Sequence, residues 1–512
     1  MDLVRDPFVK KVIKYEIEHI CFDKYNLSQK EFMMYMQADL VIKNCTIVTP
    51  DGLMENAGVA AKDGKIVAVG SSDALPSGSR EIDATGKYLT SGIIDCHIHN
   101  REPGLEYKED WGTATQAAAA GGVTTVIGMP NCIPVIDSAE NLLLKFKLGE
   151  EKAYVDFQSY CVITSDNANA KSVNELNEAG CVGYKVFLGT TIGAIPPPND
   201  GELLDAMHAI AKTGKRLGFH EEDDEILKHY EAQFKAEGRN EPIDHSLSRP
   251  PVCEREAVAR TILFSEHTGC PIHEFHLASG SGAQQVLDAK KRGINVTAET
   301  MPHYLWWNEE VMREKGNVAR IQPPIRDQIE QDMLWDIGIH GGGIDCIATD
   351  HSPHTDEEKG MDDPFQNTWN VISGFVGLES EVAAMLTFVN DGKLTLEKWV
   401  EMHSKRPAEV WGMYPEKGSL RIGTDADFTV FDLNETWTLD RKNLHSKNTA
   451  TPFHGETFTG KATMTVVRGS VVYENGEVVG ERGYGTLVDV DSMPWNSPRK
   501  LTEPLGEYKN YR

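Results

Sequence analysis

Apolar runs and amphipathic stretches alternate through the middle of the chain. Short apolar runs of strand type are each followed by a stretch in which apolar residues recur at helical spacing. The strand-like runs are TTVIGM, VDFQSYCVI, VGYKVFL, RLGFH, EFHLAS, NVTAET and IDCIATD, and the helical stretches include SAENLLLKFKLGEEKA and REAVARTILFSEHTG. Roughly eight such units predict an α/β fold, a (β/α)8 TIM barrel, over residues 93–409.

The segments before and after this region in the sequence have a different pattern. Between residues 38 and 92, short β-rich runs are broken by Asp-Gly pairs, which favour hairpins. A similar pattern returns between residues 410 and 490, so we expect both segments to form one small β-sandwich domain. Residues 1–37 place Phe8, Val12, Ile13 and Ile17 near helical spacing and predict an N-terminal helical extension. Residues 491–512 look like an irregular C-terminal tail.

Composition narrows the class of protein. The chain has 512 residues, 40% of them hydrophobic, and a formal net charge of -27. Nucleic acid and anionic membranes would repel such a charge, so we expect neither as a partner. Nine widely spaced cysteines without a CxxC pair indicate reduced thiols. No stretch of 18 apolar residues and no apolar signal region occurs, and we predict a cytoplasmic protein.

Metal-capable side chains end several of the predicted strands. GIIDCHIH ends in His97 and His99, and alternation along a strand points both to the same side. Chemistry in a barrel of this type takes place at the carboxyl ends of the strands. On later predicted strands, Lys185 lies inside the apolar run VGYKVFL, and the other metal-capable side chains in order are His220, His276 and Asp350.

The chemistry of two divalent ions explains this set. Imidazole and carboxylate groups are ligands for Zn²⁺ and similar metals. Two such ions can share one water and lower its pKa towards neutrality. An anionic group must bridge them, and a lysine amine carboxylated by CO2 becomes a carbamate with two oxygens. Asp350 can act both as a ligand and as the general base that passes a proton to the leaving nitrogen.

Longer motifs carry a resemblance over residues 38 to 480. The chain resembles the amidohydrolase superfamily, and within it the cyclic amidohydrolases: dihydroorotase, allantoinase and hydantoinase/dihydropyrimidinase. The motifs are SGIIDCHIHNREPG, AAAAGGVTTVIGMPN, GYKVFLG, FHEED, HLAS, AETMPHYL, PPIR, ATDHSPHT, GTDADFTVFD and PFHGETFTGK. The resemblance implies a metal-dependent hydrolase that opens a cyclic amide C–N bond with a hydroxide bridging two divalent metals, expected to be Zn²⁺.

The resemblance also assigns residues. One metal would be held by His97, His99, Lys185 and Asp350, and the other by Lys185, His220 and His276. Lys185 would be the N6-carboxylated bridge. We expect a small cyclic amide as substrate and a homo-oligomer, a dimer or tetramer, as the assembled form.

The REPG motif bears on the choice of substrate. In dihydroorotases an arginine after HxHx binds the substrate carboxylate, helped by the asparagine of MPN and the last histidine of ATDHxPH. Arg101, Asn131 and His354 stand at these positions. Allantoinases typically carry Asn in place of the arginine, and hydantoinases lack the trio. The alternative is therefore an allantoinase- or hydantoinase/dihydropyrimidinase-like enzyme acting on an uncharged ureide or imide ring.

Some features depart from the dihydroorotase pattern. Asn100 replaces an apolar residue, and Arg320 to Gln322 replace a frequent Lys-Val-Asn run. Residues 221–250 form a longer excursion than a compact dihydroorotase needs. These departures leave the predicted hydrolytic centre intact and keep the substrate open.

Simpler explanations stand beside the functional ones. Arg101 could pair with Glu102 or Asp110, and Asn131 could cap the following helix. His273, His303 and His351 are expected to be structural or to orient ligands. A non-catalytic scaffold with the same fold is a remote alternative, because all six ligand positions are filled. A serine or cysteine hydrolase is disfavoured, since no GxSxG motif occurs.

Overall fold

The computed structural model describes residues 37–189 and 195–490. The predicted helical extension, apart from residue 37, and the predicted C-terminal tail lie outside the described residues. Within them, no helix is long and apolar enough to cross a membrane. The eight cysteines of the described part are buried and form no disulfide with one another.

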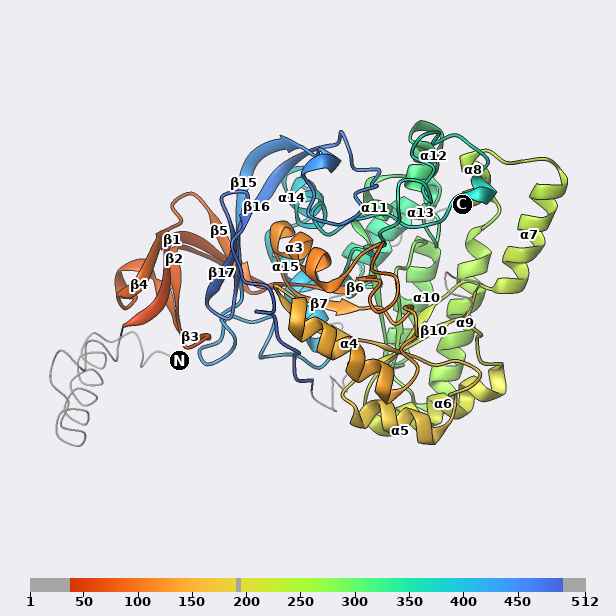
Figure 1. Ribbon diagram of the computed structural model, residues 1–512, viewed down its shortest axis with the longest axis horizontal. Helices are drawn as coiled ribbons and strands as arrows, with labels where there is room; N and C mark the ends of the chain where they lie inside the picture. Colours follow the sequence, from red (N-terminus) through yellow and green to blue (C-terminus); the bar gives the residue numbers. More distant parts are fainter. Residues whose placement is uncertain (1–36, 190–194, 491–512) are drawn as a thin grey trace.

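Both sides of the central region contribute strands to one sheet, at the left of Figure 1. Its strands lie in the order β18-β17-β16-β15-β5-β1-β2-β3, and β4 pairs with β1. They are β1 (Ala38–Thr49), β2 (Gly52–Lys62), β3 (Lys65–Ser71), β4 (Gly78–Asp83), β5 (Tyr88–Ser91), β15 (Phe428–Thr438), β16 (Thr457–Val467), β17 (Ser470–Glu474) and β18 (Glu477–Val478). Leu40, Val59, Phe428 and Val466 share one buried cluster, so the two segments fold around a common core.

The strands of the central region are parallel and form a continuous series. They are β6 (Ile93–Ile98), β7 (Val123–Gly128), β8 (Asp156–Ser159), β9 (Cys161–Val162), β10 (Tyr184–Phe187), β11 (Leu217–His220), β12 (Ile272–Glu274), β13 (Val296–Thr300) and β14 (Cys346–Ile347). One sheet runs β6-β7-β8 and the other β9-β10-β11-β12-β13-β14. β8 and β9 are separated by Tyr160 alone, so one stretch of chain pairs with β7 on one side and with β10 on the other.

The two ends of this series also meet. Ile98 at the end of β6 forms a parallel bridge with His351, just beyond β14. The backbone N–H of His99 donates to the carbonyl of His351 at 2.7 Å. The predicted α/β class with a parallel sheet is therefore confirmed, and the carboxyl ends of β6 and β14 lie side by side.

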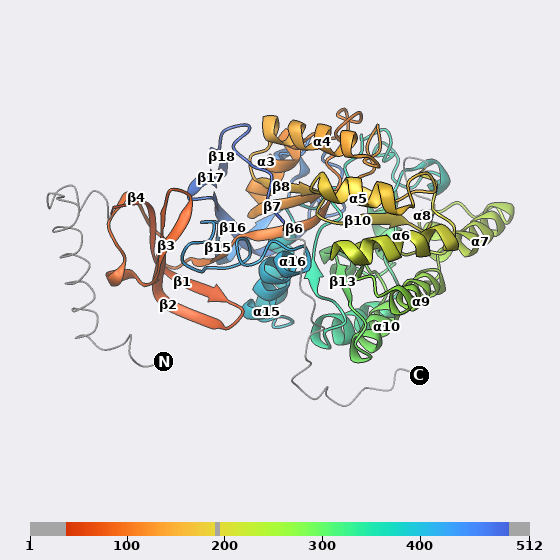
Figure 2. The same ribbon diagram turned by 90° about the horizontal axis from the view of Figure 1, so that it is seen from below.

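Helices follow the parallel strands and pack outside them (Figure 2). They are α3 (Trp111–Gly121), α4 (Ala139–Lys152), α5 (Ala170–Glu178), α6 (Asp200–Thr213), α7 (Asp224–Ala236), α8 (Pro242–Leu247), α9 (Pro251–Thr268), α10 (Gly280–Lys291), α11 (Pro302–Trp306), α12 (Val311–Glu314), α13 (Gln328–Met333), α14 (Glu381–Asn390), α15 (Leu396–Val400) and α16 (Arg406–Val410). Short helical turns are η1 (Ser72–Ala74), η2 (Gly316–Ala319), η3 (Leu334–His340), η4 (Thr368–Asn370), η5 (Glu401–Lys405) and η6 (Arg441–Asn443).

Local sequence sets the limits of α3. Asp110 accepts a hydrogen bond from the backbone N–H of Thr113, whose side chain reaches back to the N-cap backbone. The helix ends where Gly122 takes a left-handed conformation with φ 91°. Because β7 begins at the next residue, this glycine turns the chain directly from helix to strand.

A buried lysine joins the parallel strands to the sheet of both ends. Nζ of Lys417 donates to Asp156 of β8 at 2.5 Å, to Asp427 at 2.7 Å, and lies 3.0 Å from Asp425. Burial lowers the pKa of Lys417, but the three carboxylates outweigh it and hold the pKa above its ordinary value. These three acids could also form a metal-ligand group, but Lys417 pairs with all three and Arg468 pairs with Asp156.

We expect Lys417→Met to lower the free energy of unfolding by about 3–5 kcal/mol, because it removes the ion pair of the buried Asp427 within the described residues. Chemical denaturation followed by far-UV circular dichroism measures this loss. Lys43→Met is the matched control, since the Lys43–Glu81 pair is largely exposed and should contribute less than about 1 kcal/mol. Equal stability of both variants would contradict a structural role for Lys417.

Candidate metal centre

The predicted site residues converge on one cavity of about 400 Å³. Its lining comprises His97, His99, Arg101, Asn131, Lys185, Phe187, His220, His276, Ile321, Gln322, Asp350, Ser352, Ser373 and Gly374. Eight of the nine residues expected from the sequence are in this set, and the ninth, His354, lies behind Arg101. Side chains from β6, β10 and β11 and from the segments after β12 and β14 therefore meet at one place.

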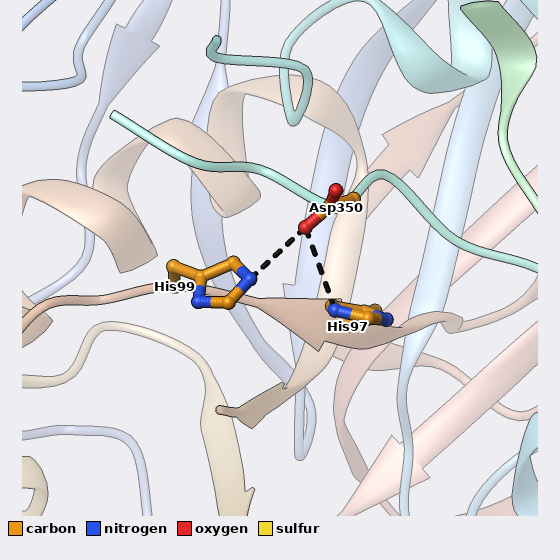
Figure 3. A group of neighbouring side chains, drawn as sticks. All are labelled: His97, His99 and Asp350. Carbon is orange, nitrogen blue, oxygen red and sulfur yellow. Dashed lines mark hydrogen bonds and ion pairs between the residues drawn. The ribbon is translucent and has the colours of Figure 1, made fainter. Parts of the chain in front are cut away.

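His97 and His99 share one carboxylate (Figure 3). Nε2 of His99 lies 3.0 Å from Oδ1 of Asp350, and Nε2 of His97 lies 3.4 Å from the same oxygen. The opposite ring nitrogens are held from behind. Nδ1 of His99 lies 2.7 Å from Asn131 Oδ1, and Nδ1 of His97 lies 2.5 Å from Glu299 Oε1. Each ring thus presents Nε2 to the centre.

His220 and His276 form a second pair. Nδ1 of His220 lies 3.0 Å from Nε2 of His276, and the ring centroids are 4.7 Å apart. Nε2 of His220 lies 3.1 Å from Glu222 Oε2, which also accepts from Nη1 of Arg249 at 2.7 Å. The Arg249–Glu222 pair therefore fixes the His220 ring with Nδ1 facing His276.

Lys185 lies in an apolar setting. Its side chain is fully buried, and Nζ has no hydrogen-bond partner within the described residues. The amine lies 4.0 Å from the ring centroid of Phe275 and 5.0 Å from that of Phe187. Phe275 can take this place because Gly218 faces it, where an added Cβ would come within 1.8 Å of its ring. Burial lowers the pKa of Lys185 to about 8.

Three residues of the site have a left-handed backbone. The φ angles are 60° for Arg101, 34° for His276 and 49° for Asp350. Such angles are unfavourable for residues other than glycine and are held only where surrounding contacts demand them. Since each residue directly follows or lies close to a strand end, the strained backbone turns its side chain into the cavity.

Burial sets the protonation of the centre. It lowers the pKa of His97, His99, His220 and His276, and the nearby Lys185 charge adds to this effect. The same burial raises the pKa of Asp350 to about 7, against the opposing charge of Lys185. The four imidazoles are therefore neutral at neutral pH and can offer a ring nitrogen to a metal ion. Asp350 can exchange a proton in the same pH range.

Arg101 is the cation of the cavity wall. It is 1% exposed, and burial lowers its pKa to about 10, so it stays charged at neutral pH. Nη2 donates to Ser352 Oγ at 2.5 Å and lies 3.0 Å from His354 Nε2, while Nε donates to the Pro353 carbonyl at 3.3 Å. Nη1 has no hydrogen-bond partner in the described part of the chain.

The simpler explanations for Arg101 and Asn131 do not hold. Glu102 pairs with Lys152, and Asp110 pairs with Lys447, so neither acid is a partner of Arg101. The N-cap of the next helix, α4, is Ser138, and Asn131 contacts His99 instead. Nδ1 of His354 lies 3.1 Å from Nζ of Lys108, so its ring is held between Lys108 and Arg101.

Other contacts were not expected from the sequence. Glu299 reaches both His97 and His273, the latter at 3.3 Å, and Glu222 orients His220. Glu299 lies in the motif AETMPHYL and Glu222 in the motif FHEED. Their places in these motifs could have indicated that they contact the metal-site histidines. His351 was expected to orient Asp350, yet its Nδ1 accepts from the backbone N–H of Gly377 at 3.2 Å.

Comparison with known proteins identifies the family. The model of the amidohydrolase family matches residues 88–472. The chain belongs to this family. An L-hydantoinase of Paenarthrobacter aurescens is 32% identical over 455 residues, covering 88% of this chain and 98% of the relative. An allantoinase of Enterococcus faecalis is 35% identical, covering 88% of this chain and all of the relative.

Other similar proteins carry the names of further cyclic amidohydrolases. A dihydroorotase of a Geobacter species is 35% identical, covering 86% of this chain and 100% of the relative. The solved L-hydantoinase (dihydropyrimidinase) of Arthrobacter aurescens superposes with a TM-score of 0.84 at 32% identity, over 88% of this chain and 100% of that one. The chain is therefore an enzyme of the cyclic amidohydrolase group, as the motifs predicted.

Proposed function

We propose that this amidohydrolase opens a carboxylate-bearing cyclic amide, as a dihydroorotase does, with divalent metals. The observation that carries the proposal is Nη1 of Arg101, a buried guanidinium nitrogen without a hydrogen-bond partner among the described residues. It borders the same cavity as His97, His99 and Asp350. A buried cation favours an anionic ligand, and a guanidinium suits a carboxylate because two N–H groups can meet two oxygens.

We infer that the parallel strands form a closed (β/α)8 barrel. The order β6 to β14, the break at Tyr160 and the bridge from Ile98 to His351 support closure. The shared cluster of Leu40 and Phe428 supports a β-sandwich made from both ends. We propose the domain limits expected from the sequence: 38–92 with 410–490, and 93–409.

The donor set fits divalent metal ions. Four imidazoles with lowered pKa and one carboxylate face each other within a few ångströms, and His97, His99 and Asp350 bring ligand atoms within 4.8 Å of one another. His97, His99, Lys185 and Asp350 would hold one ion, and Lys185, His220 and His276 the other. When bound, such ions would lower the pKa of water and polarise the ring carbonyl.

Lys185 suits the role of a carboxylated bridge. A pKa lowered to about 8 leaves part of the amine neutral at physiological pH. The neutral amine can add to CO2 and release a proton, which gives a carbamate with two oxygens. The surrounding rings of Phe187 and Phe275 exclude water from the bond that forms.

Asp350 is the proposed proton carrier. It is the carboxylate among the residues that line the cavity, and burial raises its pKa above the ordinary value in the protein without bound ions, which suits it to proton transfer. It would take the proton of the attacking water and deliver it to the ring nitrogen. Water thereby adds across the amide: the C–N bond breaks, and a carboxylate and an N–H group form.

An uncharged ring is the second candidate substrate. The solved L-hydantoinase, with a TM-score of 0.84, supports it, whereas the allantoinase and the dihydroorotase are both 35% identical and do not choose between the two kinds of ring. In that case Nη1 of Arg101 would meet a ring oxygen. The oligomeric state, the cytoplasmic location and Zn²⁺ as the metal stay predictions from the sequence.

Ring opening by the purified, Zn²⁺-loaded protein with bicarbonate tests the proposal. Dihydroorotate, dihydrouracil, hydantoin and allantoin are compared under the same conditions. We expect dihydroorotate to be preferred by at least ~10²-fold in kcat/KM, the effect of one charge-assisted contact of about 3 kcal/mol. Preference for an uncharged ring would leave the hydrolytic centre standing and overturn the carboxylate substrate.

Glu222 offers a test of the second metal position. We expect Glu222→Ala to weaken binding of one Zn²⁺ equivalent by about 10–100-fold, because His220 loses the group that orients it. Competition with a chelator measures the affinity. Glu231→Ala is the control, since Glu231 pairs on the surface with Lys235. Unchanged affinity in Glu222→Ala would contradict ligation by His220.

A further inference from the structure

A second hollow adjoins the catalytic cavity. It measures about 980 Å³ and shares Gln322 and Ser373 with that cavity. One face of α7 forms its wall, with lining residues Asp224, Leu227, Lys228, Glu231, Ala232 and Lys235. This helix belongs to the excursion 221–250 and lies at the edge of the molecule far from β1–β4 (Figures 1 and 2). We call this hollow the outer chamber.

Most charges of the outer chamber are compensated. Lys228 pairs with Asp224, Lys235 pairs with Glu231, and Arg249 pairs with Glu222 at 2.7 Å. Arg320 differs, because it makes no ion pair with any residue that the structure describes. Glu231 of the chamber wall attracts the guanidinium but is paired with Lys235, so among the described residues Arg320 is the lining cation without a direct ion pair.

Arg320 is also buried and incompletely hydrogen-bonded. It is 9% exposed, and its Nη1 donates to the carbonyls of Thr368 and Val371. Its Nε is buried without a hydrogen-bond partner among the described residues. Burial lowers its pKa to about 9, which still leaves the guanidinium charged at neutral pH. A buried charge of this kind is costly unless an anion meets it.

A second unsatisfied polar group borders both cavities. Ser373 lines both, is 6% exposed, and its Oγ has no hydrogen-bond partner in the described chain. A hydroxyl and a guanidinium together can serve both oxygens of a carboxylate.

We propose that Arg320 and Ser373 bind a carboxylate carried at the far end of a ring substituent, while the ring occupies the catalytic cavity. The proposal rests on the proposed function, because it places a cyclic amide at the metal centre. It assigns the enzyme a substrate class with an extended acidic side chain. The α7 excursion would then exist to enclose that chain.

Matched hydantoins test this proposal. Each carries a C5 chain of one to four methylenes that ends either in a carboxylate or in the neutral carboxamide of the same length. For the best chain length, we expect wild-type kcat/KM to favour the carboxylate by about 10–100-fold, the range of one charge-assisted contact. Arg320→Gln should remove this preference while leaving the carboxamide within about 3-fold of wild type. Lys171→Gln, a variant of an exposed lysine of α5 that pairs with Glu175 and does not line the chamber, should retain it.

Ser373→Ala provides a second variant. It is needed if Arg320→Gln does not fold, because that substitution removes the hydrogen bonds from Arg320 to the carbonyls of Thr368 and Val371. Ser373→Ala removes only a hydroxyl and should lower the preference by about 2–10-fold. An equal rate for carboxylate and carboxamide at every chain length in the wild type would overturn the proposal.

Equilibrium binding separates this proposal from the proposed function. Calorimetry on the metal-stripped proteins, in which we expect no ring opening, measures the affinity of wild type and Arg320→Gln for the same two ligands. If no ring is opened but the carboxylate binds wild type at least about 10-fold tighter than Arg320→Gln, the function fails and the carboxylate site stands. If rings are opened but both proteins bind both ligands equally, the carboxylate site fails alone.

Discussion

Lys185→Ala is expected to lower ring-opening kcat/KM by at least ~10³-fold and to reduce the bound metal per chain to below half of the wild-type content. The physical reason is that both metal positions lose a shared anionic ligand. Steady-state kinetics and elemental analysis of the same preparation measure the two effects. Lys185 is fully buried, so folding must be checked in parallel by thermal denaturation.

Lys185→Met separates loss of the amine from loss of packing. A methionine keeps an apolar side chain of similar length against Phe187 and Phe275, which the lysine now contacts. We expect it to be folded, poor in metal and inactive, like the alanine variant. Full metal content together with wild-type activity in either variant would contradict a bridging role for Lys185.

Arg101→Gln is expected to reduce kcat/KM for dihydroorotate by about 10²–10³-fold and to change the rates for uncharged rings by less than about 3-fold. Glutamine retains a hydrogen-bond donor but loses the positive charge that faces the cavity. The comparison between charged and uncharged rings isolates the contact with the carboxylate from general damage to the site.

Arg101→Lys provides the graded control. It keeps a charge but loses the planar pair of N–H groups, so we expect an intermediate loss on dihydroorotate. Arg101 also binds Ser352 and the Pro353 carbonyl, close to Asp350 in the chain. A uniform loss on all four rings would therefore assign Arg101 to holding this segment and not to the substrate.

The centre could be predicted from the sequence because its parts lie at fixed places in the fold. Alternation along β6 puts His97 and His99 on one side, and parallel strands bring their carboxyl ends to one edge. Lys185 within β10, His220 at the end of β11 and Asp350 shortly after β14 are then neighbours regardless of the residues between them. The β-rich patterns on both sides likewise predicted a β-sandwich built from both segments, and strands of both segments lie in one sheet.

Contacts made by tertiary packing could not be predicted in the same way. Arg249 follows α8, and its pairing with Glu222 depends on how the excursion 221–250 folds back. The choice of Lys152 over Arg101 as the partner of Glu102 depends on the position of α4. In the sequence Arg320 is only a departure from a family pattern, and the fold is needed to show that no described acid forms an ion pair with it in the outer chamber.

The central claim is that the residues around His97 and Asp350 form a divalent-metal centre for opening a cyclic amide. The most direct test titrates Zn²⁺ into the metal-stripped protein with bicarbonate and a mixture of the four rings, and follows each ring by chromatography. We predict no ring opening without metal and a rise to a plateau at about two equivalents per chain. Full activity of the stripped protein, or no opening of any ring at any Zn²⁺ level, would contradict the account.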